Sequence, residues 1–112
     1  MTQLQALLLT WLLELPIALL VCQRRDVRLV VAVVVASALT HPLVWLIGTS
    51  LPRAWWWPGI CLTEAVVGVV EGLLLWRLLR APPHPLPWRQ ALLAGVLMNA
   101  FSFGAGLVIS AR

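Results

Sequence analysis

The amino-acid sequence predicts an all-α protein, a bundle of four transmembrane helices, with residues 1–112 forming one integral membrane domain. Hydrophobic residues make up 62% of the chain and charged residues only 11%, whereas a water-soluble domain of this size needs roughly a quarter of its residues charged. The mean hydropathy is +0.96. Four apolar stretches are each about 20 residues long, which is the length of helix that crosses a ~30 Å hydrocarbon layer with its own backbone hydrogen-bonded.

The four predicted helices follow one another through three short polar links. They cover about residues 4–22, 29–48, 59–76 and 91–110. The first apolar stretch has basic residues after it rather than before it, which is the reverse of a secretory signal peptide, so we expect it to be retained as a helix. The third link, residues 80–89, is interrupted by prolines, which do not continue a helix. These are Pro82, Pro83, Pro85 and Pro87.

Arginine residues predict the orientation, because cytoplasmic links accumulate Lys and Arg. Six of them flank the first and third links, namely Arg24, Arg25, Arg28, Arg77, Arg80 and Arg89. Only Arg53 and Arg112 lie on the other side. Both termini are therefore predicted on the non-cytoplasmic side of a cell membrane, which would be the inner membrane in a bacterium. The net charge of +4 is then an orientation signal that anionic lipid supports, and no nucleic-acid partner is expected.

Tryptophans agree with this orientation, since Trp is enriched at both membrane interfaces. Trp55, Trp56 and Trp57 lie together in the second link and are predicted to form the outer belt. Trp76 and Trp88 lie close to the arginine-bearing end and are predicted to anchor the inner interface.

Eight of the polar or ionisable side chains within the apolar stretches form the candidate site. They are Glu14, Ser37, Thr40, His41, Glu64, Glu71, Asn99 and Ser102. A charged side chain at the centre of a transmembrane helix costs about 2.5 to 3.5 kcal/mol on insertion scales, so such residues usually face the bundle interior and mark a function. That cost makes these eight residues the candidate site.

Helical spacing places the polar side chains on one stripe of each helix. Glu64, Gly68 and Glu71 fall at i, i+4 and i+7, along one face of a 3.6-residue helix. The stripes of the other helices are Thr10, Glu14 and Ala18; Ser37, His41, Trp45 and Gly48; and Gly95, Asn99, Ser102, Gly106 and Ser110. Because small residues let helix backbones approach closely, the four stripes are expected to converge, with the glycines as packing points.

Depth along each helix, counted at about 1.5 Å per residue, predicts two tiers. The tier near mid-membrane holds Glu14, Glu71 and Asn99, and the tier nearer the outer face holds His41, Glu64 and Ser102. The sequence also indicates two parallel helical hairpins related as repeats. Residues 37–40 align with residues 99–102, and Glu14 and Glu71 occupy similar depths in the first and third helices.

Proton-coupled cation transport or ion binding is the first functional hypothesis. A carboxyl group in a low-dielectric interior can hold either a proton or a cation that offsets its charge. Glu14 and Glu71 are predicted to make this exchange, with His41 and Glu64 relaying protons toward the outer face. The neighbouring polar side chains predicted to support them are Ser37, Thr40, Asn99 and Ser102. An aromatic wall at Trp45 would suit an organic cation.

A metal site is a weaker hypothesis, and no cofactor is predicted. His41 and Glu64 could contribute to binding a divalent metal, since His nitrogen and carboxylate oxygen suit zinc or another first-row ion. The chain contains no HExxH or CxxC spacing.

The length of 112 residues, the four predicted helices and Glu14 in the first of them resemble the small multidrug resistance exporters. This resemblance implies a dimer that exchanges protons for cationic drugs at Glu14. The chain departs from that family in its third segment, which lacks the aromatic and glycine pattern and carries Glu64 and Glu71 instead. Its arginine bias also specifies a single orientation, whereas some members insert both ways.

Two other classes remain open. One is an accessory or assembly subunit of a larger membrane complex, in which the polar stripes only hold helices together. The other is an intramembrane enzyme that uses glutamate and His41 for acid–base chemistry, with Ser102 as a nucleophile if a base lies within reach. In each class a chain this small is expected to act as a homo-oligomer or with partners in the lipid bilayer.

Overall fold

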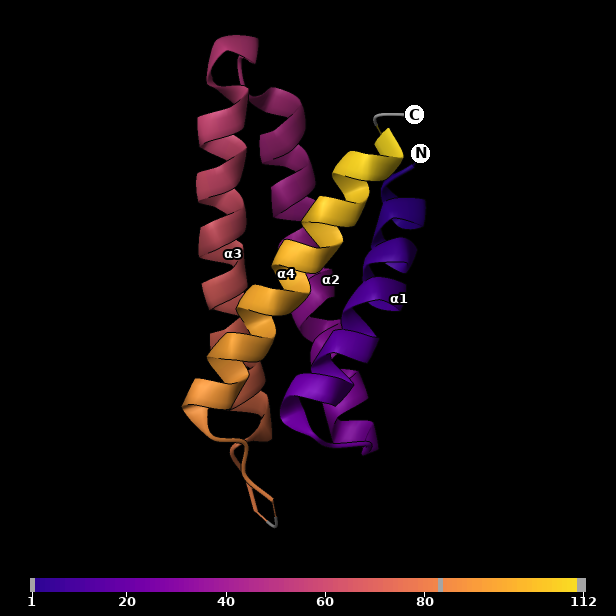
Figure 1. Ribbon diagram of the computed structural model, residues 1–112, viewed down its shortest axis with the longest axis vertical. Coiled ribbons are helices and arrows are strands. Elements are labelled where there is room, and N and C mark those ends of the chain that lie inside the picture. The colour runs from indigo at the N-terminus through magenta and orange to yellow at the C-terminus, as the bar shows by residue number, and fades with distance from the viewer. Residues whose placement is uncertain (1, 83, 111–112) are drawn as a thin grey trace.

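The structure is a computed structural model that describes residues 2–82 and 84–110. Within them the chain forms four α-helices, which confirms the all-α four-helix bundle (Figure 1). They are α1 (Gln3–Cys22), α2 (Val27–Ser50), α3 (Trp56–Leu79) and α4 (Trp88–Ser110), with a short 3-10 turn, η1 (Arg53–Trp55), before α3. Each helix contains its predicted segment and extends it by at most three residues at an end. All four are long and apolar enough to cross a membrane. Pro83, Arg112 and the side chain of Ser110 lie outside the described part of the chain.

Local capping defines where the first two helices begin. Thr2 caps α1 in a capping box, because its hydroxyl accepts from Gln5 N at 3.1 Å and the Gln5 side chain accepts from Thr2 N at 2.9 Å. Gln23 ends α1 in the left-handed conformation, at φ 52° and ψ 41°. Asp26 then caps α2 by accepting from Leu29 N at 3.3 Å, and the Arg24 guanidinium holds the Asp26 carboxylate in an ion pair.

Arginine side chains also tie the two links at the lower end of Figure 1 to each other. Arg24 donates to the His84 carbonyl at 2.8 Å, and Arg28 donates to the Ala81 carbonyl at 3.0 Å. Leu86 is buried, and its N–H donates to the Leu79 carbonyl at 2.8 Å, which closes the link between α3 and α4. These long-range bonds join the α1–α2 hairpin to the α3–α4 hairpin at this end.

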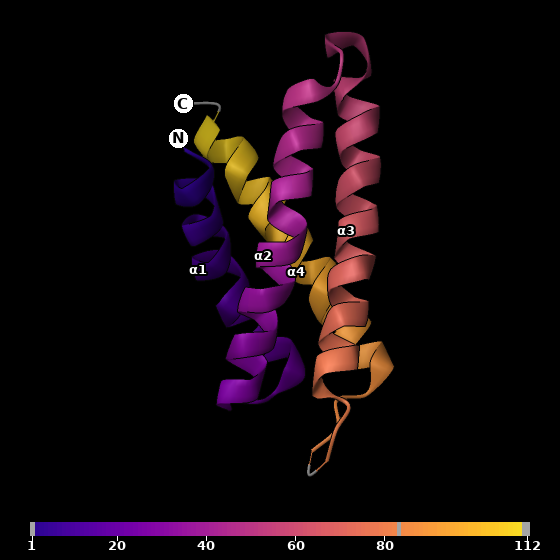
Figure 2. The ribbon, with the colours of Figure 1, turned by 180° about the vertical axis from the view of Figure 1, so that it is seen from behind.

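The helices form a ring in which α1, α2, α3 and α4 each contact two neighbours. Within the described residues α1 does not contact α3, and α2 does not contact α4. Figures 1 and 2 show α4 crossing the bundle diagonally, beside α3 at the lower end and beside α1 at the upper end, where both termini lie. The centre of the upper half is therefore surrounded by four helices.

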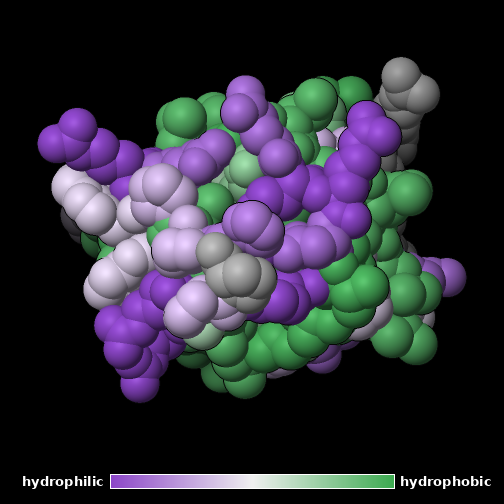
Figure 3. Space-filling model, turned by 90° about the horizontal axis from the view of Figure 1, so that it is seen from below, coloured by the Kyte–Doolittle hydropathy of each residue, from purple (hydrophilic) through white to green (hydrophobic). Residues whose placement is uncertain are grey.

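The lower half of the bundle is filled by small and aliphatic side chains. The core cluster there consists of Ala18, Cys22, Leu29, Ala32, Val33, Leu75, Leu79, Leu86, Ala91, Ala94 and Met98. Seen from this end, hydrophilic residues gather over the base and hydrophobic residues surround it (Figure 3). The flanks of the helices expose many Leu and Val side chains, such as Leu12 and Leu20, as expected where lipid is the neighbour.

Glycines bring α3 and α4 unusually close. A Cβ on Gly95 would lie 2.3 Å from Gly72 N and 2.6 Å from Gly68 O, so only glycine fits at this crossing. Gly68 and Gly95 thus act as the packing points that their stripes predict. Gly106, predicted in the same role, is not one, because a Cβ there would meet nothing within 4 Å.

Candidate functional site

The predicted stripes converge on a central cavity of about 630 Å³ in the upper half of the bundle. All eight candidate residues line it, namely Glu14, Ser37, Thr40, His41, Glu64, Glu71, Asn99 and Ser102. The lining runs from Glu71, deep in the bundle, up to Ala6 and Trp56 near the upper end. Below the cavity, the aliphatic core closes the lower half.

Glu14 links three helices through hydroxyl groups. Its side chain is 1% exposed. Ser37 of α2 donates to Glu14 Oε2 at 2.5 Å, and Ser102 of α4 donates to Glu14 Oε1 at 3.3 Å. The single hydroxyl hydrogen of Ser102 is also within reach of the Asn99 carbonyl, at 3.2 Å. Through these contacts Glu14 joins α1 to α2 and α4.

Glu71 is about as buried as Glu14, but a hydrogen bond reaches only one of its two carboxyl oxygens within the described residues. It is 2% exposed, and Thr40 donates to Glu71 Oε1 at 2.8 Å. The single hydroxyl hydrogen of Thr40 is also within reach of the Ala36 carbonyl, at 3.1 Å. Glu71 Oε2 is buried and has no hydrogen-bond partner within the described part of the chain. This oxygen is therefore an unpaired, buried acceptor on a residue that lines the cavity.

Asn99 bonds Glu64 rather than Glu71. Its amide nitrogen donates to the Glu64 carbonyl at 2.6 Å and to Glu64 Oε2 at 2.5 Å. The two predicted tiers are therefore not separate, since Asn99 of one tier pairs with Glu64 of the other, and Ser102 likewise bonds Glu14. The diagonal course of α4 is the reason, because counting residues along a helix takes no account of its tilt (Figure 1).

His41 lines the cavity without joining the hydrogen-bond network. Its Nδ1 is buried and has no partner among the residues that the structure describes. The ring stacks on Trp45, with centroids 6.2 Å apart and planes at 21°. No hydrogen bond joins His41 to Glu64 in the described chain, so the predicted relay between them is not a direct contact.

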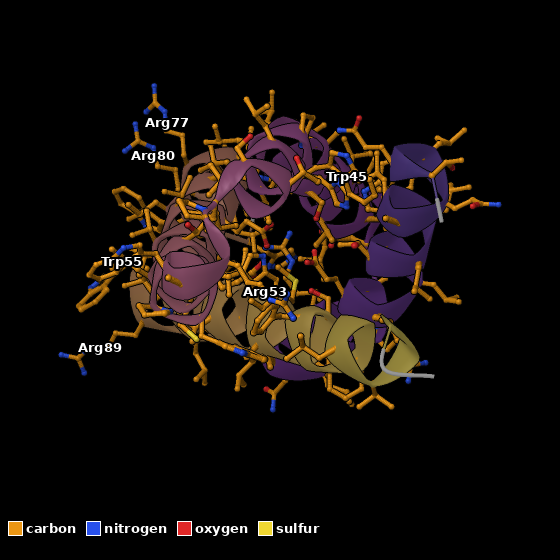
Figure 4. All side chains as sticks on the ribbon, turned by 90° about the horizontal axis from the view of Figure 1, so that it is seen from above. Trp45, Arg53, Trp55, Arg77, Arg80 and Arg89 are labelled. Atoms are coloured by element: carbon orange, nitrogen blue, oxygen red, sulfur yellow. The ribbon has the colours of Figure 1, made fainter. Side chains whose placement is uncertain are left out.

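Three aromatic side chains line the cavity, and we call them the aromatic rim: Trp45, Trp56 and Phe103. Trp56 was predicted as a belt residue, but it turns inward and donates from Nε1 to the Gly48 carbonyl at 3.0 Å. Helical spacing gave no clear signal for this, because eight residues at about 100° each place Trp56 roughly 80° around the helix from Glu64. Trp55, by contrast, is 67% exposed and points away from the bundle (Figure 4).

The predicted hairpin repeat matches one pair of contacts and not another. Thr40 bonds Glu71 across the hairpins just as Ser102 bonds Glu14, and these residues are equivalent in the predicted alignment. The Ser37 bond to Glu14 has no such counterpart, because Asn99, at the position equivalent to Ser37, bonds Glu64 instead.

The metal hypothesis for His41 and Glu64 gains no third ligand of the usual acidic, His or Cys kind from the described residues. No three His, Cys, Asp or Glu side chains of the described residues lie close enough together to hold a metal ion. The arrangement instead offers separate carboxyl groups, each with its own polar partner, around a volume much larger than one ion.

The fold and the cavity define a class, a four-helix bundle with membrane-spanning dimensions and an acidic interior. No protein-family model, curated protein or solved structure matches the chain. The resemblance to small multidrug resistance exporters therefore stays limited to length, helix number and Glu14.

Proposed function

We propose that this protein spans a cell membrane, binds a cation in the central cavity and exchanges it for protons at Glu14 and Glu71. The observation that carries the proposal is the convergence of two buried carboxyl groups from α1 and α3, helices that do not touch each other in the described chain, on one cavity. An acidic group inside a membrane bundle is costly, so its presence there is best explained by use.

The orientation follows from the basic end of the bundle. Arg24, Arg25 and Arg28 flank the lower end of α1 and α2, and further arginines flank α3 and α4 there. Because cytoplasmic links accumulate arginine, we place this closed end on the cytoplasmic side. The termini and the end of the cavity at Ala6 and Trp56 then belong to the non-cytoplasmic side. Figure 4 shows Arg53 over the middle of that end, and Arg77 and Arg80 pointing outward.

Charge balance defines the exchange. A carboxyl group that gives up its proton becomes an anion, and a monovalent cation entering the cavity restores neutrality in the low-dielectric interior. The cation leaves when a proton returns, so each carboxyl couples one positive charge to one proton. Transport across the bilayer further requires a second conformation in which the lower half opens. Movement of α3 relative to α4 in that change would alter their close contact at Gly95.

Purified protein in proteoliposomes tests the exchange. We expect an inward gradient of Na⁺, K⁺, N,N,N-trimethylphenethylammonium or protonated N,N-dimethylphenethylamine to drive proton release, above that in protein-free liposomes, for at least one of these cations, and a trapped pH dye records it. Glu14→Gln and Glu71→Gln should each abolish it while leaving folded protein in detergent. Asp26→Asn is the matched control, because it makes the same chemical change outside the cavity and keeps a good helix cap. Full flux in both cavity variants, or no flux in the wild type, would refute the proposal.

The alternatives have their own readouts. An accessory subunit should co-purify in mild detergent with a stoichiometric larger partner, and Glu14→Gln should lower assembly. For an enzyme, Ser102 is the candidate nucleophile, and its hydroxyl reaches both Glu14 Oε1 and the Asn99 carbonyl, at 3.3 and 3.2 Å. Glu14 is therefore a base within reach of Ser102, whereas His41 makes no hydrogen bond to Ser102 in the described chain. An enzyme should lose turnover on mutation of His41 or Ser102 without moving any ion.

A further inference from the structure

Resting on the exchange proposed above, we infer that the cation is a protonated amine that keeps at least one N–H and carries an apolar or aromatic body. Its N–H is donated to Glu71 Oε2, which is buried in the structure and which a rotation of the carboxyl group turns toward the cavity, and its body lies against the aromatic rim of Trp45, Trp56 and Phe103. The inference names the ligand class of the central cavity and separates it from inorganic ions and from quaternary ammonium ions.

The hydrogen-bond inventory of the two most buried glutamates supports an N–H donor. Both oxygens of Glu14 and Oε1 of Glu71 accept from a hydroxyl group, whereas Glu71 Oε2 has no partner among the described residues. A buried polar atom left unpaired is unfavourable in either protonation state of the carboxyl group. A ligand that donates an N–H to Glu71 Oε2 removes this penalty and supplies the opposite charge at the same point.

A second unpaired polar atom belongs to a residue of α2 that lines the cavity. His41 Nδ1 is buried, lines the same cavity and has no partner within the described part of the chain. His41 directly follows Thr40 in the chain, and Thr40 donates to Glu71 Oε1. An imidazole nitrogen accepts or donates according to its tautomer, so it can meet a second polar group of the ligand.

The size and walls of the cavity favour an organic molecule. Its volume of about 630 Å³ lies within the range of small-molecule pockets, ~300–1,000 Å³, and far exceeds the ~30 Å³ that one water occupies. Aliphatic residues such as Leu9, Val44 and Ile60 complete the wall with the aromatic rim. Aromatic faces also attract a cation directly.

Inorganic and quaternary cations fit these positions poorly. A hard cation such as Ca²⁺ takes about six to eight oxygen ligands, and no three His, Cys, Asp or Glu side chains are gathered in the described chain. A quaternary ammonium has no N–H, so it leaves Glu71 Oε2 unpaired. A site that contains an unpaired hydrogen-bond acceptor binds an analogue without the N–H donor more weakly than the ligand that has it.

A matched pair of probes tests this discrimination, first on the wild-type protein. N,N-dimethylphenethylamine is protonated at pH 7 and carries one N–H, which N,N,N-trimethylphenethylammonium replaces with a methyl group. Binding to purified wild-type protein is measured by calorimetry or tryptophan fluorescence. We expect the amine to bind about tenfold to a hundredfold more tightly. Glu71→Gln should abolish this preference, and Asp26→Asn should keep it, because it makes the same chemical change outside the cavity lining.

The outcomes separate this inference from the exchange on which it rests. Equal affinities, a preference for the quaternary ion, or no binding of either probe at millimolar concentration overturn the amine assignment. A preference that persists in folded Glu71→Gln also overturns the role given to Oε2. If the quaternary ion drives proton release as well as any other cation, the exchange survives and the amine assignment fails. If the amine is preferred but no proton release occurs, the binding assignment survives and the exchange fails.

Discussion

Replacing Gly95 with alanine tests the close crossing of α3 and α4. The added Cβ would lie 2.3 Å from Gly72 N, 2.6 Å from Gly72 Cα and 2.6 Å from Gly68 O. All three are backbone atoms, so no side-chain rotation relieves the overlap. Ordinary contact begins at 3.4 Å, so the two helices must separate by about 1 Å at this point. A gap of that size forfeits roughly a quarter to a half of the dispersion energy of each contact it opens.

The expected net loss in the free energy of unfolding is roughly 2 kcal/mol. Overpacking costs about 1 to 3 kcal/mol or more, and alanine returns up to about 1 kcal/mol of helix propensity. Gly104→Ala is the control, because a Cβ there meets nothing within 4 Å and the same propensity gain applies. Reversible unfolding in mixed detergent and SDS, followed by circular dichroism, measures both. Equal stability of Gly95→Ala and Gly104→Ala would refute the reasoning.

Two other substitutions test the hydrogen bond between Ser37 and Glu14 in the cavity and the Asp26 cap of α2. Ser37→Ala removes the donor to Glu14 Oε2 and should lower the free energy of unfolding by about 1 to 3 kcal/mol. Thr49→Val is the control in the same assay and should be close to neutral, because the Thr49 hydroxyl bonds only carbonyls of its own helix. Equal free energies of unfolding for the two variants would contradict this. Asp26→Ala should cost about 0.5 to 2 kcal/mol at pH 7 by loss of the cap. The hydrogen bond from Arg24 lowers the pKa of Asp26, so its stabilisation is complete above the unfolded value near 4 and is lost as pH falls through the lower folded value. Thermal unfolding from pH 7 to 3 should show the difference from wild type shrinking below about pH 4, and a pH-independent difference would count against it.

The residues of the cavity could be predicted because two local properties select them. The 3.6-residue period assigns Glu14, Glu64 and Glu71 to inward faces, and the cost of polar groups in lipid requires those faces to turn away from the membrane. Neither property depends on how the helices are arranged. All eight candidate side chains accordingly line one cavity.

Partner choice could not be predicted in the same way. Asn99 pairs with Glu64 and not with the equally plausible Glu71, and Trp56 turns inward beside two exposed tryptophans. The pairing of Asn99 depends on how α4 lies against α3, where their glycines bring the two backbones close together. The inward turn of Trp56 depends instead on the Gly48 carbonyl of α2 lying within reach of its Nε1. A small difference in the tilt of a helix axis changes which of its side chains lie at the same depth as those of the neighbouring helices.

The sequence by itself determined the class, the four apolar helices, the basic end and the inward polar stripes, since length, hydrophobicity and helical period are properties of each segment alone. Tertiary structure decided the ring order, the filled lower half and the single unpaired oxygen of Glu71. Hydrogen bonds and close packing are short-range and directional, so they are settled only when separate helices reach their final positions.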